Sequence, residues 1–172
     1  KMDRVGANFQ NVVEEVREKL GAKPLRILIP IGSEDQLKGQ IDVLNKKAVV
    51  YTEDDTLGST FEIRELDAEQ AKEAEKAYGE IVETLADADE QLGEKFLLEE
   101  EITVTDLKNA MRRATIANKV VPIAGGSAFK NKGVQYLVDA VIDYLPSPLE
   151  IPAARGQRFD DENDQVVAPT AV

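Results

Sequence analysis

Residues 126–133, Gly-Ser-Ala-Phe-Lys-Asn-Lys-Gly, decide how the rest of the chain is organised. The apolar run Val-Val-Pro-Ile-Ala at 120–124 precedes them, and apolar residues at helical spacing follow them as far as Leu145. A buried strand, a loop of small residues and an amphipathic helix in that order predict one βα unit of an α/β fold. In such folds a ligand lies on the loop at the carboxyl end of the strand.

Two small residues in this loop, Ser127 and Ala128, would let a flat base approach the backbone, and the Ala128 N–H is a candidate donor to a base carbonyl. The first residues of the chain, Lys1-Met2-Asp3, sharpen that prediction because Lys-x-Asp ends the Asn-Lys-x-Asp motif with which GTPases recognise guanine. One carboxylate accepts from the ring N1–H and from the exocyclic amine, and a base without these donors leaves it unpaired. Asp3 is then the guanine reader, while the Lys1 stem lies along the ring. Since the Asn of the motif would precede Lys1, we expect the natural N-terminus to lie upstream.

Several blocks along the chain resemble bacterial-type elongation factor G. Besides Lys1–Asp3, they are Leu-Ile-Pro-Ile-Gly at 28–32, Lys-Gly-Gln-Ile-Asp at 38–42, residues 126–134 and Asp-Tyr-Leu-Pro-Ser-Pro at 143–148. The resemblance covers roughly residues 1–156, and the block at 127–148 separates the chain from release factor three and from the tetracycline ribosomal protection proteins. It implies a translational GTPase that drives translocation of tRNA and mRNA on the ribosome, and that this chain is one piece of it.

The spacing of the two guanine motifs predicts an insertion. A compact GTPase has one helix and one strand between them, whereas 124 positions (127 − 3) separate Asp3 from Ser127. The family has such an insertion, the G′ subdomain, which we expect to be self-contained and to occupy residues 22–118. Residues 1–21 and 119–148 would be the C-terminal part of the GTP-binding domain, and 149–172 a linker or the start of the next domain, partly disordered. The predicted fold class is therefore α/β, a P-loop GTPase-type remnant with an inserted α+β subdomain.

Hydrophobic patterns predict the individual elements. The final helix would pack on strands that precede Lys1, so we expect its side chains Leu137, Val138, Val141 and Ile142 to lose much of their burial. Asp160–Asp164 is polar and is predicted to be disordered or a linker. The expected elements are a helix from Asn8 with a left-handed cap at Gly21, strands at 25–29 and 120–124, a hairpin at 40–51, a half-buried strand at 61–66, helices starting at Asp67 (bending at 87–90) and Thr103, and a helix at 134–145.

Composition excludes several functions. The net charge is −12, which argues against a direct nucleic-acid site and suits a basic protein partner. With no Cys and no His, disulfides, thiolate metal sites and imidazole catalysis are excluded. No apolar run approaches membrane-spanning length. We expect a soluble, cytoplasmic monomer that does not contact membranes.

The groups that act on phosphates are not found in this sequence. No Gly-x-x-x-x-Gly-Lys-[Ser/Thr] pattern occurs, so neither the phosphate-cradling loop nor its Mg²⁺-binding hydroxyl is present. Asp55-Thr56-Leu57-Gly58 matches the Asp-x-x-Gly switch in letters, but it lies between strand patterns and is interpreted as a turn. GTP or GDP is thus expected in the parent protein. The isolated chain is expected to have no catalytic residue and no metal ligand, to leave GTP intact, and to bind it weakly or not at all.

Three other residues surround the candidate base site. Phe129 is a candidate guanine contact, although we expect its ring to anchor the loop in the core. Lys130 and Lys132 either pack near guanine and ribose or are solvated lysines ahead of a helix, and the sequence does not choose between these alternatives.

An acidic helix face is the second candidate site. Glu80, Glu83 and Asp87 lie at i, i+3 and i+7, away from the apolar stripe of a long predicted helix. Such a face is usually only solvated. The family resemblance implies instead that it meets the C-terminal domain of the ribosomal stalk protein, and we favour that interpretation.

Two rival functions stay open beside an elongation factor G fragment. One is a stand-alone acidic interaction module that binds a basic protein without nucleotide. The other is a different translational GTPase. The start inside a nucleotide motif favours the fragment over the stand-alone module.

Overall fold

A five-stranded sheet runs through the part of the protein that the computed structural model describes, residues 1–52, 60–148, 150, 155–158 and 161–167. The strand order is β4-β3-β2-β1-β5. β5 runs parallel to β1, and the remaining neighbours are antiparallel. The strands are β1 (Pro24–Ile31), β2 (Gly39–Asp42), β3 (Lys47–Tyr51), β4 (Phe61–Arg64) and β5 (Val121–Ala124).

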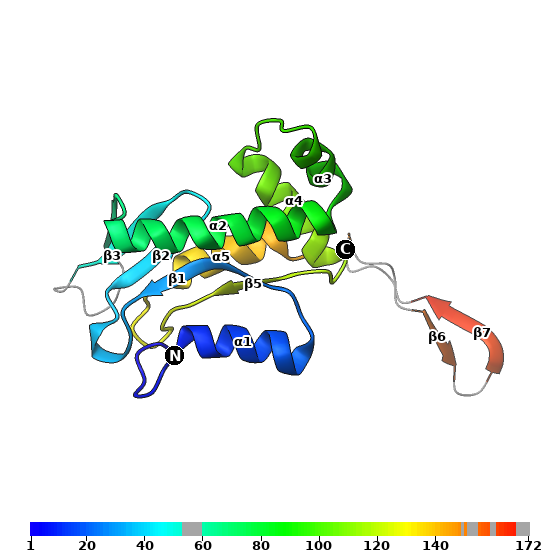
Figure 1. The fold of residues 1–172 in the computed structure, drawn as a ribbon. Helices are drawn as coiled ribbons and strands as arrows, with labels where there is room; N and C mark the ends of the chain where they lie inside the picture. Colours follow the sequence, from blue (N-terminus) through cyan, green and yellow to red (C-terminus); the bar gives the residue numbers. More distant parts are fainter. Residues whose placement is uncertain (53–59, 149, 151–154, 159–160, 168–172) are drawn as a thin grey trace.

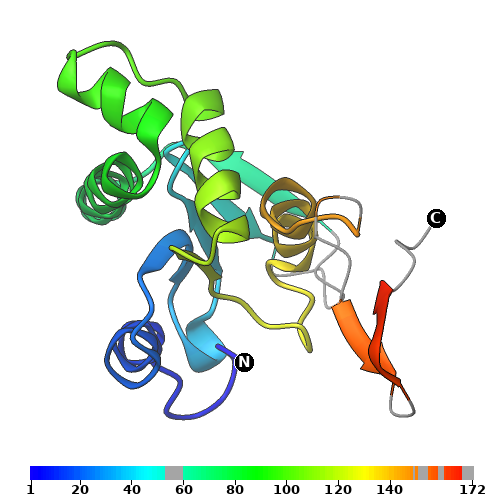
Figure 2. The ribbon, with the colours of Figure 1, turned by 90° about the vertical axis from the view of Figure 1, so that its right-hand side faces the viewer.

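Helices cover both sides of this sheet. Figure 1 shows α1 on one side of β1 and β5, and α2 running across the other side. In the view turned by 90° (Figure 2), α3 folds back from the end of α2, and α4 leads down toward α5. The helices are α1 (Phe9–Leu20), α2 (Ala68–Ala88), α3 (Glu90–Leu97), α4 (Val104–Ile116), α5 (Val134–Tyr144) and the short 3-10 helix η1 (Glu34–Gln36).

The predicted helix boundaries are confirmed by their caps. Asp67 accepts from the backbone N–H of Gln70, whose side chain accepts in return from the Asp67 N–H, which forms a capping box at the start of α2. Thr103 forms the same motif with Asp106 at the start of α4. Gly21 ends α1 with a φ of 62°, a left-handed conformation that glycine adopts without a steric penalty.

The expected insertion is not self-contained. Its first strand, β1, pairs in parallel with β5, which we placed in the GTP-binding part, with Pro24 opposite Val121 and Leu28 opposite Ala124. This pairing gives the backbone groups of β5 that face β1 their hydrogen-bond partners, so one ladder joins the two parts of the sequence. The inserted segment therefore extends the sheet of the βα unit.

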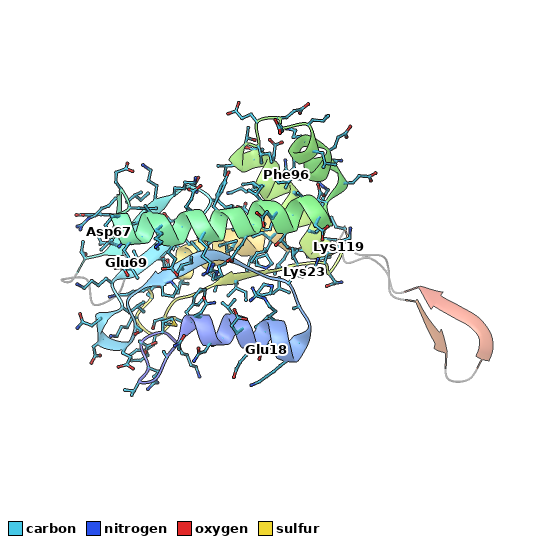
Figure 3. All side chains as sticks on the ribbon, viewed as in Figure 1. Glu18, Lys23, Asp67, Glu69, Phe96 and Lys119 are labelled. Carbon is cyan, nitrogen blue, oxygen red and sulfur yellow. The ribbon has the colours of Figure 1, made fainter. Side chains whose placement is uncertain are left out.

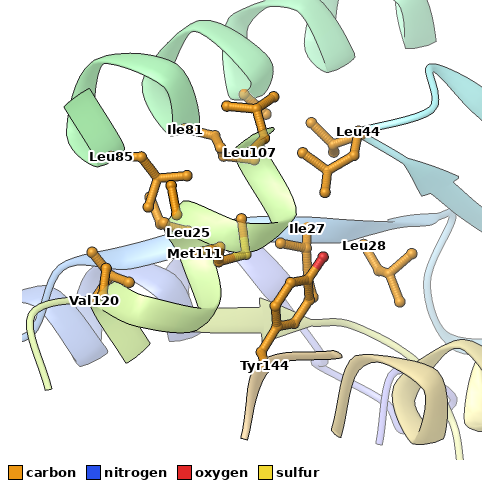
Figure 4. Packing of buried hydrophobic residues seen from close by; sticks show 14 of the residues in the cluster. Leu25, Ile27, Leu28, Leu44, Ile81, Leu85, Leu107, Met111, Val120 and Tyr144 are labelled. Atoms are coloured by element: carbon orange, nitrogen blue, oxygen red, sulfur yellow. The ribbon is translucent and has the colours of Figure 1, made fainter. Parts of the chain in front are cut away.

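The core lies between the sheet and α2, α4 and the end of α5. Figure 4 shows Ile81 and Leu85 of α2 above Leu25 and Met111, with Tyr144 of α5 beside Ile27. All four residues predicted for the buried side of α4 are buried, namely Leu107, Ala110, Met111 and Ala114. Removing a fully buried large side chain from water contributes about 1.5–3 kcal/mol, so these contacts dominate the stability of this half.

The apolar side of α5 is exposed, as expected. Leu137, Val138, Val141 and Ile142 are 49%, 52%, 47% and 70% exposed, and Val121 of β5 is 43% exposed. Only Tyr144 of α5 is buried. The amphipathic pattern of α5 thus points to a packing surface that no described element covers.

Two expectations have a different outcome, and a third is not tested. Asp161–Asp164 is not a linker, because Asp161–Val167 forms strand β7, which pairs with β6 (Arg155–Arg158) in a separate two-stranded ladder. The reason is local, since an antiparallel return satisfies the backbone whatever the polarity of the residues. The strand at β4 is more exposed than half-buried, with Ile63 61% exposed. Asp55–Gly58 lies outside the described residues.

Within the described part, no helix combines the length and apolarity needed to cross a bilayer.

Asp89, between α2 and α3, gives a test of stability. Its carboxylate accepts from Arg113 at 2.7 and 2.8 Å and from the Leu92 N–H at 3.0 Å. The Arg113 hydrogen bonds hold the pKa of Asp89 below its ordinary value. Asp89→Asn keeps a cap acceptor but removes the charge, and we expect it to lower the free energy of unfolding by about 2–3 kcal/mol at neutral pH. Urea titration measures this difference.

The contribution of the Asp89 carboxylate to the free energy of unfolding should depend on pH in a definite direction. Because the folded pKa is lowered, the carboxylate stabilises the fold above its unfolded pKa of about 3.9, and this contribution is lost as the pH falls through the folded value. The gap between wild type and Asp89→Asn should therefore narrow below about pH 4. Asp87→Asn, at an exposed position two residues earlier, is the matched control and should change little. A gap that is constant with pH would contradict the assignment.

Candidate functional site

The two segments singled out in the sequence lie against each other. The Ser127 hydroxyl donates to Asp3 Oδ1 at 2.6 Å, across 124 positions of the chain. The Met2 N–H donates to the Gly126 carbonyl at 3.0 Å, and the Met2 side chain is buried. The structure thus brings Lys1–Asp3 together with the loop that follows β5.

Asp3 is held as an ionised acceptor. The Ser127 hydroxyl lowers the pKa of the Asp3 carboxyl, and the nearby Arg4 guanidinium acts in the same direction, while partial burial opposes both. Only 7% of the Asp3 side chain is exposed, and Oδ2 lies 3.9 Å from Arg4 Nε. A carboxylate offers about four acceptor positions, and the Ser127 hydroxyl takes one. The remaining acceptor positions are of the kind that two adjacent N–H donors require, although Asp3 does not line the cavity beside the loop.

The base loop, which we define as residues 125–133, is closed by its own backbone. The N–H groups of Ser127 and Lys132 donate to each other's carbonyl oxygens, both at 2.9 Å. The Ser127 hydroxyl also accepts from the Lys130 N–H at 3.2 Å. Asn131 has a φ of 50°, a left-handed conformation that asparagine tolerates. At the tip of this turn Ala128 is exposed, one residue after the serine that binds Asp3.

Phe129 does not anchor the base loop in the core. Its side chain is 87% exposed, because the turn from Ala128 to Asn131, closed by the Asn131 N–H donating to the Ala128 carbonyl, directs it outward. The anchoring expectation is therefore wrong. Phenylalanine side chains are usually buried, but the geometry of this loop directs the Phe129 ring to solvent.

The two loop lysines reach other partners. The Lys132 ammonium donates to the Leu37 carbonyl at 2.7 Å, so it is directed toward the connection between β1 and β2. Lys130 Nζ lies 3.9 Å from the exposed Asp35 carboxylate. Both contacts tie the base loop to η1 and its flanks.

A cavity of about 320 Å³ opens next to the base loop. This volume falls in the range of about 300–1,000 Å³ that is typical of small-molecule sites. Lys1, Ser127 and Ala128 border it, and its floor is apolar, formed by Phe9, Val12, Ile123 and Leu137. Among the described residues there is no group of three or more carboxylates that would hold a metal ion.

Glu34 supports the Asp3 segment and was missed by the sequence reasoning. Its backbone N–H donates to the Met2 carbonyl at 2.6 Å, and its carboxylate accepts from the Gly6 N–H at 2.7 Å. A glutamate after a strand carries no local signal of such a contact. Its φ of 56° is the backbone feature that places it there.

The acidic residues of α2 are only partly free. The Glu80 carboxylate accepts from Arg26 Nη2 at 2.7 Å, and Arg26 is buried. Asp87 receives a 3.3 Å contact from Lys23, which Figure 3 places below the C-terminal half of α2. Glu83 is exposed and has no ion pair within the described residues. Of the three candidate contacts, Glu83 is thus the carboxylate most available to a partner.

The described residues form a mixed α/β domain around a five-stranded sheet, and the comparisons with known proteins match this fold to the G domain of translational GTPases. Residues 1–147 match the sequence family described as elongation factor Tu GTP binding domain. A crystal structure of a protein from Thermus thermophilus is similar, with a TM-score of 0.73 and 29% sequence identity. The match covers 84% of this chain and 21% of that protein, so the chain spans about a fifth of the length of its structural relative.

The protein belongs to the family that carries the elongation factor Tu GTP-binding domain. This family is one of translational GTPases, which bind guanine nucleotide. The stand-alone acidic module without nucleotide is accordingly not favoured.

Proposed function

We propose that this chain supplies the guanine-recognising half of the nucleotide site in a translational GTPase of the elongation factor G type. The observation that carries the proposal is the 2.6 Å hydrogen bond between Ser127 and Asp3, which holds an ionised carboxylate beside a small-residue loop. Asp3 accepts from the N1–H and the 2-amino group of guanine, Lys1 lies along the ring, and the Ala128 N–H donates to the base carbonyl.

The residues present fit a base but not the chemistry on phosphates. Asp3 is ionised and Ala128 is small and exposed, whereas the sequence contains no phosphate-loop pattern. Positioning of the phosphates and of Mg²⁺, which GTP hydrolysis requires, would come from elsewhere in a complete GTPase. The isolated chain therefore binds guanine nucleotide weakly and does not hydrolyse GTP. Its role in translocation of tRNA and mRNA, in the cytoplasm, would be exercised by the whole protein.

Exchange of Asp3 for asparagine tests the guanine assignment. With GDP added to the chain, we expect NMR shift changes at the Ser127 and Ala128 amides, and none with ADP. Asp3→Asn should reduce the response to GDP at least tenfold, because an amide donates where guanine also donates. Xanthosine diphosphate, which carries a carbonyl in place of the 2-amino group, should restore the response in the variant.

Asp35→Asn is the matched control for this experiment. Its carboxylate lies in η1, close to the same loop, but its side chain is 98% exposed. It should leave the response to GDP unchanged. Equal responses of wild type and Asp3→Asn to GDP would overturn the assignment of Asp3 as the guanine reader.

We also propose that α2 contacts the C-terminal domain of the ribosomal stalk protein through Glu83, with Glu80 and Asp87 at the margins. The support is the net charge of −12 and the exposed carboxylate row on α2. Exposed ion pairs add little to affinity, but like-signed charges on one face steer an oppositely charged partner and raise its association rate. Glu80 contributes less than expected from sequence, since Arg26 already neutralises part of its charge.

Charge reversal tests this surface. Glu83→Lys combined with Asp87→Lys should slow association with the stalk domain and flatten its salt dependence, because ions screen the charges that were removed. Stopped-flow mixing at two ionic strengths measures both effects. The control, Glu15→Lys with Glu18→Lys on α1, changes the net charge equally at another exposed site. If both double variants associate at the same rate, the α2 face is only solvated.

A further inference from the structure

The base loop is held from beneath by groups of the β2–β3 hairpin. The Gln40 amide nitrogen donates to the Gly125 carbonyl at 2.7 Å, and the Tyr51 hydroxyl accepts from the Gly133 N–H at 2.7 Å. Gln40 is 1% exposed and Tyr51 is 3% exposed. Gln40 of β2 and Tyr51 of β3 therefore hydrogen-bond to the first and last residues of the base loop. Both strands belong to the segment that we predicted to be an insertion.

Two glycines of the base loop, Gly126 and Gly133, lie close to the Gln40 side chain. A Cβ at Gly133 would lie 1.6 Å from Gln40 Nε2, and one at Gly126 would lie 3.0 Å from the same atom. Gly133 also has a φ of 91°, which strongly favours glycine. A side chain at Gly133 would therefore collide with the Gln40 amide, so the loop backbone lies close against that amide.

Burial of Gln40 is not explained by stability alone. Its carbonyl oxygen, Oε1, is buried and has no hydrogen-bond partner in the described structure. A buried unpaired carbonyl is unfavourable, and an apolar side chain of the same shape would avoid it. Among the described residues, the bond from Nε2 to the Gly125 carbonyl is the hydrogen bond that offsets part of this cost.

The Tyr51 hydroxyl, which accepts from the Gly133 N–H, is also held in position. The Tyr51 ring packs against Phe61 of β4 with centroids 5.8 Å apart, and Phe61 packs at 5.8 Å against Tyr136 of α5. These rings set the position of the Tyr51 hydroxyl, because a ring clamped by neighbours leaves the oxygen little freedom. Both anchors of the base loop therefore stand on rigid strands.

We propose that Gln40 and Tyr51 are positioning residues for guanine recognition, which hold the base loop where Ser127 and Ala128 meet the base beside Asp3. This inference rests on the proposed guanine site and extends it to the inserted segment. The hairpin is part of the base site without touching the base. A displacement of β2 and β3 would then be transmitted to Ser127 through two hydrogen bonds.

Two conservative variants test the proposal in the full chain. Gln40→Met keeps the volume and removes the donor, and Tyr51→Phe keeps the ring and removes the acceptor. Each should speed hydrogen exchange at the base-loop amides far more than at the amides of β1 and α2, with only a small fall in the urea midpoint from the one unpaired backbone group. Each should also reduce the initial slope of the GDP-induced shifts at Ser127 and Ala128 by about three- to tenfold. Gln91→Met on α3 and Tyr78→Phe on α2, which remove the same groups away from the base loop, are the controls and should change neither readout.

The outcomes separate this proposal from the one it rests on. Unchanged loop exchange in both variants overturns the positioning role, whatever GDP does. Faster exchange with an unchanged GDP slope also overturns it, and so does a general loss of stability, which would make the two residues ordinary core. If wild type gives no GDP response at all, the guanine assignment fails, while the exchange rates still decide whether Gln40 and Tyr51 hold the loop.

Discussion

The parallel pairing of β1 with β5 is the contact on which the candidate site depends. It aligns Pro24 with Val121 and Leu28 with Ala124, so the chain that leaves β5 emerges beside the chain that leaves β1. The first segment, Lys1–Asp3, reaches the same place because α1 packs along β1 and Glu34, just after β1, binds the Met2 backbone. Without this pairing, β5 would not place the Ser127 hydroxyl next to the Asp3 carboxylate.

Through the same sheet, the inserted segment also contacts the base loop. β2 pairs with β1 and carries Gln40, and β3 pairs with β2 and carries Tyr51, so both reach the base loop from neighbouring strands. On the other side, buried Arg26 of β1 joins Gln10 of α1 to Glu80 of α2. The proposed partner surface and the helix that follows Asp3 thus share one guanidinium. The 2.7 Å bond to the Glu80 carboxylate is charge-assisted and strong, whereas the 3.4 Å contact with the neutral Gln10 amide is weak, so Arg26 fixes α2 to the sheet more firmly than it holds α1.

Local patterns predicted local structure well. The caps at Asp67 and Thr103 and the buried stripe of α4 depend on residues three or four positions apart, and sequence displays such spacings directly. The meeting of Asp3 and Ser127 was predicted from a motif, not from physics. Its hydrogen bond and the lowered pKa of Asp3 follow only from the folded geometry.

What the sequence did not predict depends on long-range contacts. Gln40 lies 85 positions from Gly125, and Tyr51 lies 82 positions from Gly133, so no periodicity relates them. Phe129 was misjudged because hydrophobicity does not reveal which way a tight turn directs its side chain. The continuous sheet was missed for a related reason, since strand order is set by pairing partners that lie far apart in sequence.

The acidity of Asp3 tests most directly whether the two base-recognising segments meet as described. Carboxyl-carbon NMR titration of the wild-type chain should give an Asp3 pKa below its ordinary value of about 3.9. Ser127→Ala should raise it, because the hydroxyl that donates to Oδ1 is the main cause of the lowered pKa. Ser33→Ala, at a serine whose side chain makes no cap hydrogen bond, should leave it unchanged. An Asp3 pKa at its ordinary value in wild type, insensitive to Ser127→Ala, would contradict the account.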